Sequence, residues 1–127
     1  MQDLCLEQLV ELDLLAKIGE VLGLAGVNIE GLSMSSFKEQ SVIHFVVEDA
    51  AKAKKVLERR GFKVKEITDV FVLDKDQVGI TGKSGSFGEI CKTLADNGVQ
   101  VNFGYPAENN RFIFGVSDVK KAEELFR

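Results

Sequence analysis

Apolar and polar residues follow one pattern that occurs twice along this chain. Apolar side chains recur at helical spacing within residues 14–25 and again within residues 87–95. Gly26 ends the first stripe and Asn97-Gly98 ends the second, because glycine tolerates the left-handed conformation that a helix end favours. The pattern therefore predicts one amphipathic helix in each half of the chain.

Each predicted helix is followed by the signals of a β-hairpin. Residues 27–29 and 99–101 are short runs with β-branched side chains and alternating polarity, which favours strands. Residues 41–47 and 111–116 are rich in apolar and aromatic residues and are predicted to be the returning strands. Each half therefore contains a helix and then a hairpin.

A second helix is predicted after each hairpin, over residues 50–59 and 119–126. Asp49 and Asp118 stand at the two N-cap positions, where a carboxylate accepts hydrogen bonds from free N–H groups of the first turn. The shared order of helix, glycine, strand, strand and helix indicates a duplication. Each half has the order β-α-β-β-α-β, which is that of a ferredoxin-like sandwich with helices on one face of an antiparallel sheet.

The ends of the two halves depart from this order. Residues 4–15 also carry apolar side chains at helical spacing, but we predict a strand over residues 3–8. The second half reaches Arg127 within or just after its second helix, so its last strand is missing from the prediction. We therefore divide the chain into a first module over residues 1–74 and a second over residues 75–127.

Residues 62–73 form a strand-like run that is too long for one ordinary strand. We expect a bend near Thr68-Asp69. Residues 77–81 are expected to open the second module, and residues 70–73 are expected to pair with them in place of the missing edge strand.

Composition narrows the class of protein. The chain has 127 residues, 45% of them hydrophobic and 28% charged, with a formal net charge of −4, which is typical of a globular protein. No apolar run is long enough for a membrane helix, and the acidic balance speaks against a nucleic-acid or membrane partner. Cys5 and Cys91 lack the spacing of a metal site, so we expect a cytoplasmic protein with reduced thiols and no metal or cofactor.

The residue types needed for catalysis are missing. His44 is the single histidine and is interpreted as a partly exposed residue of the sheet, while Cys91 falls on a helical apolar stripe and is interpreted as a core residue. The run Gly82-Lys83-Ser84 is not the phosphate-binding P-loop, because that motif requires glycine where this chain has Gln77. We therefore predict no catalytic residue and no enzyme activity.

The stretches at residues 14–29 and 82–101 resemble the ACT domain family. Their shared form is a helix with spaced apolar residues, a glycine and a short strand, as in the first copy's GVNI. This family consists of small ligand-sensing modules on amino-acid biosynthetic enzymes and of free-standing tandem pairs. The resemblance implies two tandem ferredoxin-like modules of the ACT type, an α+β fold.

The resemblance also implies a ligand site where two modules meet. Members bind amino acids through the loop after the first strand and the start of the second strand. Carried over to this chain, that comparison gives the following residues: Gly82, Lys83, Ser84, Gly85, Ser86, Asn28, Gln100 and Asp13.

The second-copy loop is the better candidate for that site. The family usually has Pro-Gly there, and Ser84-Gly85 keeps the glycine, whereas the first-copy loop around Asp13 has neither residue. N–H groups at a helix N-terminus and the charge of Lys83 suit a carboxylate, and the amides of Asn28 and Gln100 both donate and accept.

We therefore expect a non-catalytic regulatory module that binds a small molecule, an amino acid first of all. Sheet edges favour a homodimer, and the signal would pass to a partner enzyme or transporter. Two alternatives stay open: a protein–protein interaction module without a ligand, and a nucleotide-sensing ferredoxin-like protein that uses residues 82–86.

Overall fold

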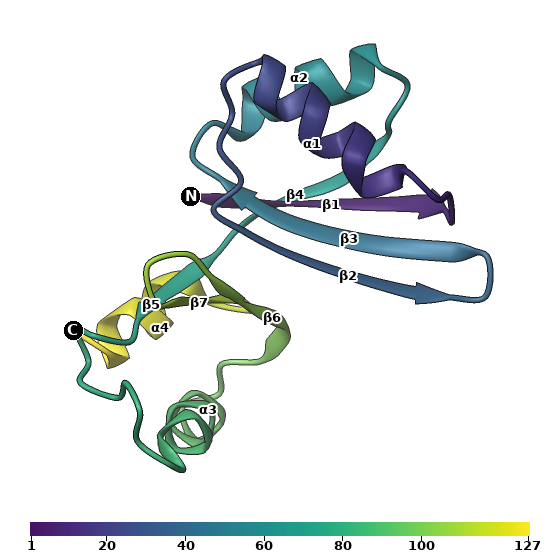
Figure 1. Ribbon diagram of the computed structural model, residues 1–127. Helices are drawn as coiled ribbons and strands as arrows, with labels where there is room; N and C mark the ends of the chain where they lie inside the picture. Colours follow the sequence, from purple (N-terminus) through teal and green to yellow (C-terminus); the bar gives the residue numbers. More distant parts are fainter. The chain divides into compact units, whose positions relative to one another are not determined.

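The computed structural model describes all residues of the chain and divides it into two compact units, Met1–Thr68 and Asp69–Arg127 (Figure 1). The division therefore lies earlier in the sequence than the boundary expected after residue 74. Each unit has its own cluster of buried apolar side chains. No helix in either unit has both the length and the hydropathy needed to span a membrane.

The first unit is a four-stranded sheet with two helices on one face (Figure 1). Its strands are hydrogen-bonded in the order β4-β1-β3-β2, and β3 is antiparallel to both β1 and β2. The elements are β1 (Gln2–Leu9), α1 (Leu14–Leu24), β2 (Gly31–Phe37), β3 (Gln40–Val47), α2 (Ala50–Arg59) and β4 (Val64–Asp69). The strand expected at residues 3–8 is confirmed.

Alternation along the two central strands builds the core of the first unit. In β1 and β3 every second side chain faces α1 and α2, so the core residues of each strand are two positions apart. The helices contribute side chains at helical spacing. The main members of this core are Leu4, Leu6, Ile18, Leu22, Ile43, Phe45, Ala53 and Leu57.

The second unit has three strands in the order β6-β7-β5, with β7 antiparallel to both neighbours. Its elements are β5 (Phe71–Asp74), α3 (Ser86–Asp96), β6 (Val101–Ala107), β7 (Arg111–Val116) and α4 (Val119–Leu125). Both helices contribute to one core with the sheet. The main members of this core are Phe71, Leu73, Ile90, Leu94, Phe114 and Ala122.

The expected pairing of residues 70–73 with residues 77–81 is wrong. β5 pairs with β7, from Phe71 opposite Phe114 to Asp74 opposite Arg111, and residues 77–81 form turns. The side chain of Asp74 causes the chain to turn, because its Oδ1 accepts the N–H groups of Asp76 and Gln77 at 3.0 and 3.1 Å. The strand that opens the second unit is therefore β5, not residues 77–81.

A bend was expected near Thr68-Asp69; the structure has both residues within β4 and interrupts the strand-like run one residue later, at Val70 between β4 and β5. The strands expected at residues 27–29 and 99–101 are wrong in position, because only Val101 of these residues lies in a strand. The structure starts β2 at Gly31 and β6 at Val101. The glycine turns at the ends of α1 and α3 keep the chain in an irregular conformation for several residues first.

Candidate functional site

Two consecutive turns form the last part of the connection between β5 and α3. The carbonyl of Ile80 accepts the N–H of Lys83 at 3.1 Å, and the carbonyl of Lys83 accepts the N–H of Ser86 at 3.3 Å. The third residue of each turn is a glycine with positive φ, Gly82 at +72° and Gly85 at +81°. With ψ of −12°, Gly85 has the conformation of the third position of a type II turn, where a side chain is strained.

Ser86 locks the second of these turns at the start of α3. Its Oγ donates to the carbonyl of Lys83 at 2.7 Å, within the turn that it closes. The N–H groups of the helix's first turn have no partner within the helix and carry partial positive charge. The loop therefore ends on an electropositive helix terminus.

A cluster of three polar side chains joins this loop to the β6–β7 turn. Oδ1 of Asp76 accepts from Thr81 Oγ1 at 2.6 Å and from Asn110 Nδ2 at 2.8 Å, and Asn110 Nδ2 also lies 2.6 Å from Thr81 Oγ1. These hydrogen bonds from Thr81 and Asn110 hold the pKa of Asp76 below its usual value, so its carboxylate stays ionised. The cluster fixes the loop against the hairpin.

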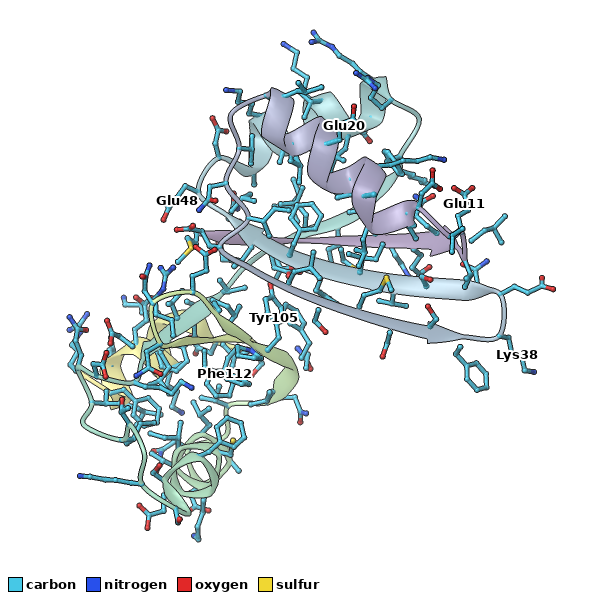
Figure 2. All side chains as sticks on the ribbon, in the orientation of Figure 1. Glu11, Glu20, Lys38, Glu48, Tyr105 and Phe112 are labelled. Carbon is cyan, nitrogen blue, oxygen red and sulfur yellow. The ribbon has the colours of Figure 1, made fainter.

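An open pocket of about 550 Å³ lies between this loop, the first turn of α3 and the β6–β7 hairpin; we call it the β5–α3 pocket. Its apolar wall includes Phe87 and Phe112, whose rings meet at 5.0 Å between centroids, and Figure 2 shows Phe112 between β7 and α3. Its polar wall includes Lys75 and Lys83 and no carboxylate. Neither lysine forms an ion pair, so the lining residues carry a net positive charge on a chain of net charge −4, and the ionised Asp76 lies directly behind Thr81 and Asn110.

The structure brings four of the expected site residues together. Gly82, Lys83, Ser84 and Ser86 line the β5–α3 pocket, and Gly85 sets the turn between them.

Gln100 lies at the other end of β6. Its neighbour Val101 pairs with Val116, whereas the pocket is at the end where Ala107 pairs with Arg111, roughly 20 Å away along the strand. The Gln100 side chain bonds the carbonyl of Val101. Within the second unit, Gln100 therefore does not share the pocket of the loop.

Asn28 and Asp13 belong to the first unit and make local contacts there. The amide of Asn28 donates to the carboxylate of Glu30. Asp13 lies 3.5 Å from the ammonium of Lys17 and makes no cap hydrogen bond to α1. A joint site of Asn28 with the second-copy loop stays a prediction.

Sequence reasoning missed several residues that line the β5–α3 pocket, among them Lys75, Asn110 and Phe112. Lys75 and Phe112 join the pocket because β5 pairs with β7, which was not predicted. Asn110 has φ of +54°, and asparagine is one of the few residues that tolerates this conformation. The Asn109-Asn110 pair in the predicted turn was a signal for its place, though not for its bonds to the loop.

The groups considered for catalysis have ordinary structural places. Nδ1 of His44 lies 2.8 Å from Oδ2 of Asp3, and the histidine side chain is 21% exposed, as expected for a partly exposed sheet residue. Cys91 is half-buried against the core of the second unit, and burial raises the pKa of its thiol. A thiol in that state is a poor nucleophile at neutral pH.

Comparison with known proteins gives a likeness in structure only. No protein-family model matches the sequence, and no curated protein matches it. A protein from Bacteroides thetaiotaomicron is similar with a TM-score of 0.78 and 23% identity, over 98% of this chain and 84% of that one. The regulatory subunit of aspartate kinase from Thermus thermophilus is similar with a TM-score of 0.73 and 14% identity, over 99% and 87% of the two chains.

An aspartate kinase chain is similar over about a third of its length. The aspartate kinase of Clostridium acetobutylicum, described as an allosteric enzyme, has a TM-score of 0.59 and 17% identity, over 99% of this chain and 33% of that one. The aspartate kinase regulatory subunits have ACT-domain folds. The resemblance to the ACT domain family is therefore confirmed at the level of the fold: this chain has an α+β, ACT-like fold of the kind found in regulatory subunits.

Proposed function

We propose that this chain is a tandem pair of ACT-like, ferredoxin-like modules that binds an amino acid and has a regulatory, non-catalytic role. The observation that carries the proposal is the β5–α3 pocket, where four residues of the expected loop line one positively charged pocket. Its likeness in fold to aspartate kinase regulatory subunits supports the regulatory part.

The pocket offers a partner for each part of an amino acid. The ammonium of Lys83 and the N-terminus of α3 attract the carboxylate. Asn110 uses its Nδ2 for Asp76 and Thr81, which leaves its amide oxygen to accept from the ligand's ammonium. The rings of Phe87, which is 47% exposed, and Phe112 suit an apolar side chain.

The regulatory output follows from a change in populations. A ligand that binds one arrangement of modules or subunits more tightly than another shifts the equilibrium toward it. We propose that the chain acts in the cytoplasm as a homodimer and that a partner enzyme or transporter responds to this shift.

The test is a thermal-shift screen with the twenty amino acids, followed by calorimetry with each one that stabilises the protein. The proposal expects at least one to raise the melting temperature by binding the folded state. Gly85→Val should abolish that binding because a β-branched residue cannot keep the turn at a φ of +81°.

Gly98→Val is the matched control for this variant. Gly98 has a φ of +75° at the other end of α3, so valine causes similar backbone strain away from the pocket. Binding should persist in that variant. Equal affinity of Gly85→Val and the unmodified protein for the ligand would show that the loop is not part of the binding site.

A second candidate function is supported by exposed apolar side chains in the first unit. Leu12, Phe37 and Leu9 are 107%, 76% and 60% exposed, and Leu9 and Phe37 both lie opposite Gln40, at the same end of the sheet. Exposed apolar side chains that gather in one place favour a protein-binding surface. This function would be favoured if none of the amino acids stabilises the protein and if the protein self-associates or binds a protein partner through these residues. Stabilisation by ATP or GTP alone would instead favour nucleotide sensing.

A further inference from the structure

Helix α1 of the first unit carries an exposed row of uncharged residues that the proposed function does not use. Leu15, Gly19 and Gly23 follow one another at intervals of four residues and therefore lie on one side of the helix. We call this row the α1 stripe. All three residues are exposed, and Leu12, in the turn before the helix, is fully exposed as well.

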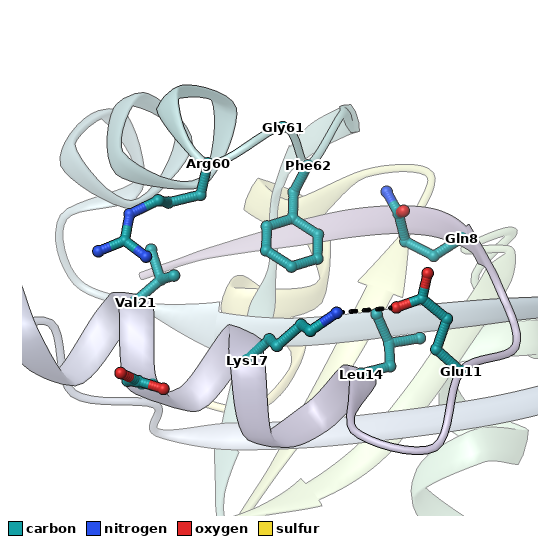
Figure 3. A pocket seen from close by; sticks show the side chains of 9 residues that line it. Gln8, Glu11, Leu14, Lys17, Val21, Arg60, Gly61 and Phe62 are labelled. Carbon is teal, nitrogen blue, oxygen red and sulfur yellow. Dashed lines mark hydrogen bonds and ion pairs between the residues drawn. The ribbon is translucent and has the colours of Figure 1, made fainter.

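The α1 stripe lies on the side of α1 that faces away from α2. Figure 3 shows Lys17 and Val21 on the side of the helix that faces the turn after α2, where Arg60 and Phe62 lie. Gly19 is two residues from both Lys17 and Val21, and two residues turn an α-helix by about 200°. The stripe therefore takes no part in the packing of the two helices of this unit.

Nothing inside the chain requires glycine at the two glycine positions of the stripe. A Cβ built at Gly19 or Gly23 would meet no atom within 4 Å, and neither residue has a positive φ. Glycine in the interior of a helix is less stable than alanine. The two glycines therefore weaken α1, and they leave a flat surface that a second helix can approach closely.

We propose that the α1 stripe packs antiparallel against the α1 stripe of a second copy of this chain, around a two-fold axis beside Gly19. Leu15 and Gly23 lie four residues from Gly19 in opposite directions, so this axis places Leu15 of each copy opposite Gly23 of the other. Leu12 and Gly26 lie seven residues from Gly19 and are related in the same way. Each exposed leucine thus fits the space left by a glycine of the second copy.

The charges of the helix ends favour the antiparallel arrangement. The N-terminus of a helix carries partial positive charge and the C-terminus partial negative charge. In α1 no acidic residue in the first turn and no basic residue in the last turn offsets these charges. Antiparallel pairing brings each positive end beside a negative end, whereas parallel pairing would bring like ends together and set Leu15 against Leu15.

Two residues of β2 add apolar surface on the same face of the sheet. Leu32 and Met34 stand opposite Phe45 and Ile43 of β3, which face the helices, so Leu32 and Met34 lie on the face that α1 covers. Both are exposed. Together with one helix, they form a surface of fewer residues than the roughly 20–30 a side of a stable interface. We therefore expect a reversible dimer whose population depends on protein concentration.

The test is sedimentation equilibrium of the full chain without ligand, from micromolar to millimolar concentration. The unmodified chain should exchange between monomer and dimer. Gly19→Gln should weaken dimerisation by about tenfold or more, because the longer side chain fills the space beside the two-fold axis. The same change should raise the midpoint of denaturant unfolding of the monomer, because glutamine is the better helix former and meets no neighbour there. Effects of opposite sign exclude misfolding as the cause.

Two matched controls come from the chain itself. Gly88 is inside α3 with no atom within 4 Å of a Cβ, so Gly88→Gln should raise the unfolding midpoint and leave dimerisation within about twofold. Leu24 is exposed and lies nine residues after Leu15, half a turn away on the opposite side of α1. Leu15→Ala should weaken the dimer by about tenfold, and Leu24→Ala should leave it within about twofold.

Three results would overturn the inference: a chain that stays monomeric over this range, a dimer that Gly19→Gln leaves intact, or equal effects of Leu15→Ala and Leu24→Ala. The inference rests on the proposed function only in giving its homodimer a surface, and it requires no ligand. The thermal-shift screen therefore separates the two. Stabilisation by an amino acid without any dimer would contradict this inference alone, and a dimer that no amino acid stabilises would contradict the ligand proposal alone.

Discussion

At the scale of single residues, the loop before α3 is defined by the conformations of Ser84 and Gly85. Ser84 is the second residue and Gly85 the third of a type II turn, where proline and glycine respectively are favoured. The backbone N–H of Ser84 makes no backbone hydrogen bond. The turn geometry thus explains why Ser-Gly can replace the Pro-Gly of the ACT family.

The first prediction is that Ser84→Pro is tolerated. Proline loses no hydrogen bond at this position and restricts the unfolded chain, so the free energy of unfolding should stay unchanged or rise by up to about 1 kcal/mol. Denaturant unfolding measures this. A loss of more than about 1 kcal/mol would show that the turn at Ser84 differs from the type II form.

A second residue-scale prediction concerns Gly115 of β7, which lies opposite Phe103 of β6. The Phe103 ring covers this glycine so closely that a Cβ there would lie 2.1 Å from the ring. Gly115→Ala should therefore displace the ring and lower the free energy of unfolding by about 1–3 kcal/mol.

Gly88→Ala is the control of opposite sign for Gly115→Ala. Gly88 is inside α3 with open space around its Cα, so alanine there should stabilise the helix by about 0.5–1 kcal/mol. Chemical denaturation of both variants gives the comparison. Similar changes in both would contradict the role of the Phe103 ring.

The residue scale also shows what sequence could and could not predict about the site. Gly82 and Gly85 were identified because turn chemistry is local: two or three neighbouring residues decide it. Lys75 and Asn110 were missed because they reach the pocket through pairing between β5 and the β6–β7 hairpin, a contact between distant segments. Local sequence signals do not specify which strands pair or in which register, so they do not predict such a contact.

At the scale of elements, the helices that follow an aspartate begin in two ways, with or without a hydrogen bond from the first turn to the aspartate side chain. Oδ1 of Asp49 accepts the N–H of Lys52 at 3.1 Å, and Oδ1 of Asp118 accepts the N–H of Lys121 at 3.0 Å, as their positions in the sequence predicted. Asp13 stands before α1 in the same way but makes no such bond. Aspartate at an N-cap position is therefore not sufficient evidence of a cap.

This difference gives the third prediction. Asp49→Ala should lower the free energy of unfolding by about 1 kcal/mol, because an N–H of α2 loses its acceptor. Asp13→Ala should cost clearly less, since it removes only an exposed ion pair with Lys17. Equilibrium unfolding of the two variants tests the order, and a larger loss for Asp13→Ala would contradict it.

Sequence patterns predicted every helix and both hairpins of this chain, because each rests on periodic apolar residues within one segment. The error at residues 77–81 has a different cause. Val78 and Ile80 alternate with polar residues as in a strand, but the bonds of Asp74 turn the chain before them. β5, moreover, is already paired with β7, so residues 77–81 are not needed as an edge strand.

At the scale of the whole molecule, the two units differ in how fully they complete one plan. The first unit has the strand order β4-β1-β3-β2, and the second has the order β6-β7-β5. The strands β5, β6 and β7 thus correspond to β1, β2 and β3, and the second unit has no counterpart of β4. The helices and hairpins of the plan are present in both units. Each unit also surrounds a separate core, so we expect the two units to respond separately to a loss of core packing.

The last prediction tests that separation with a matched pair of leucines. Leu57 of α2 and Leu94 of α3 are both 0% exposed, one in each core. Replacing either by alanine should cost about 2–5 kcal/mol, because a cavity remains where the side chain was. If the cores act separately, Leu94→Ala should speed amide exchange in β5, β7 and α3 and leave β1 and β3 nearly unchanged, while Leu57→Ala should do the reverse. Hydrogen exchange followed by NMR measures both, and equal loss of protection in both units from either variant would show that they unfold as one cooperative body.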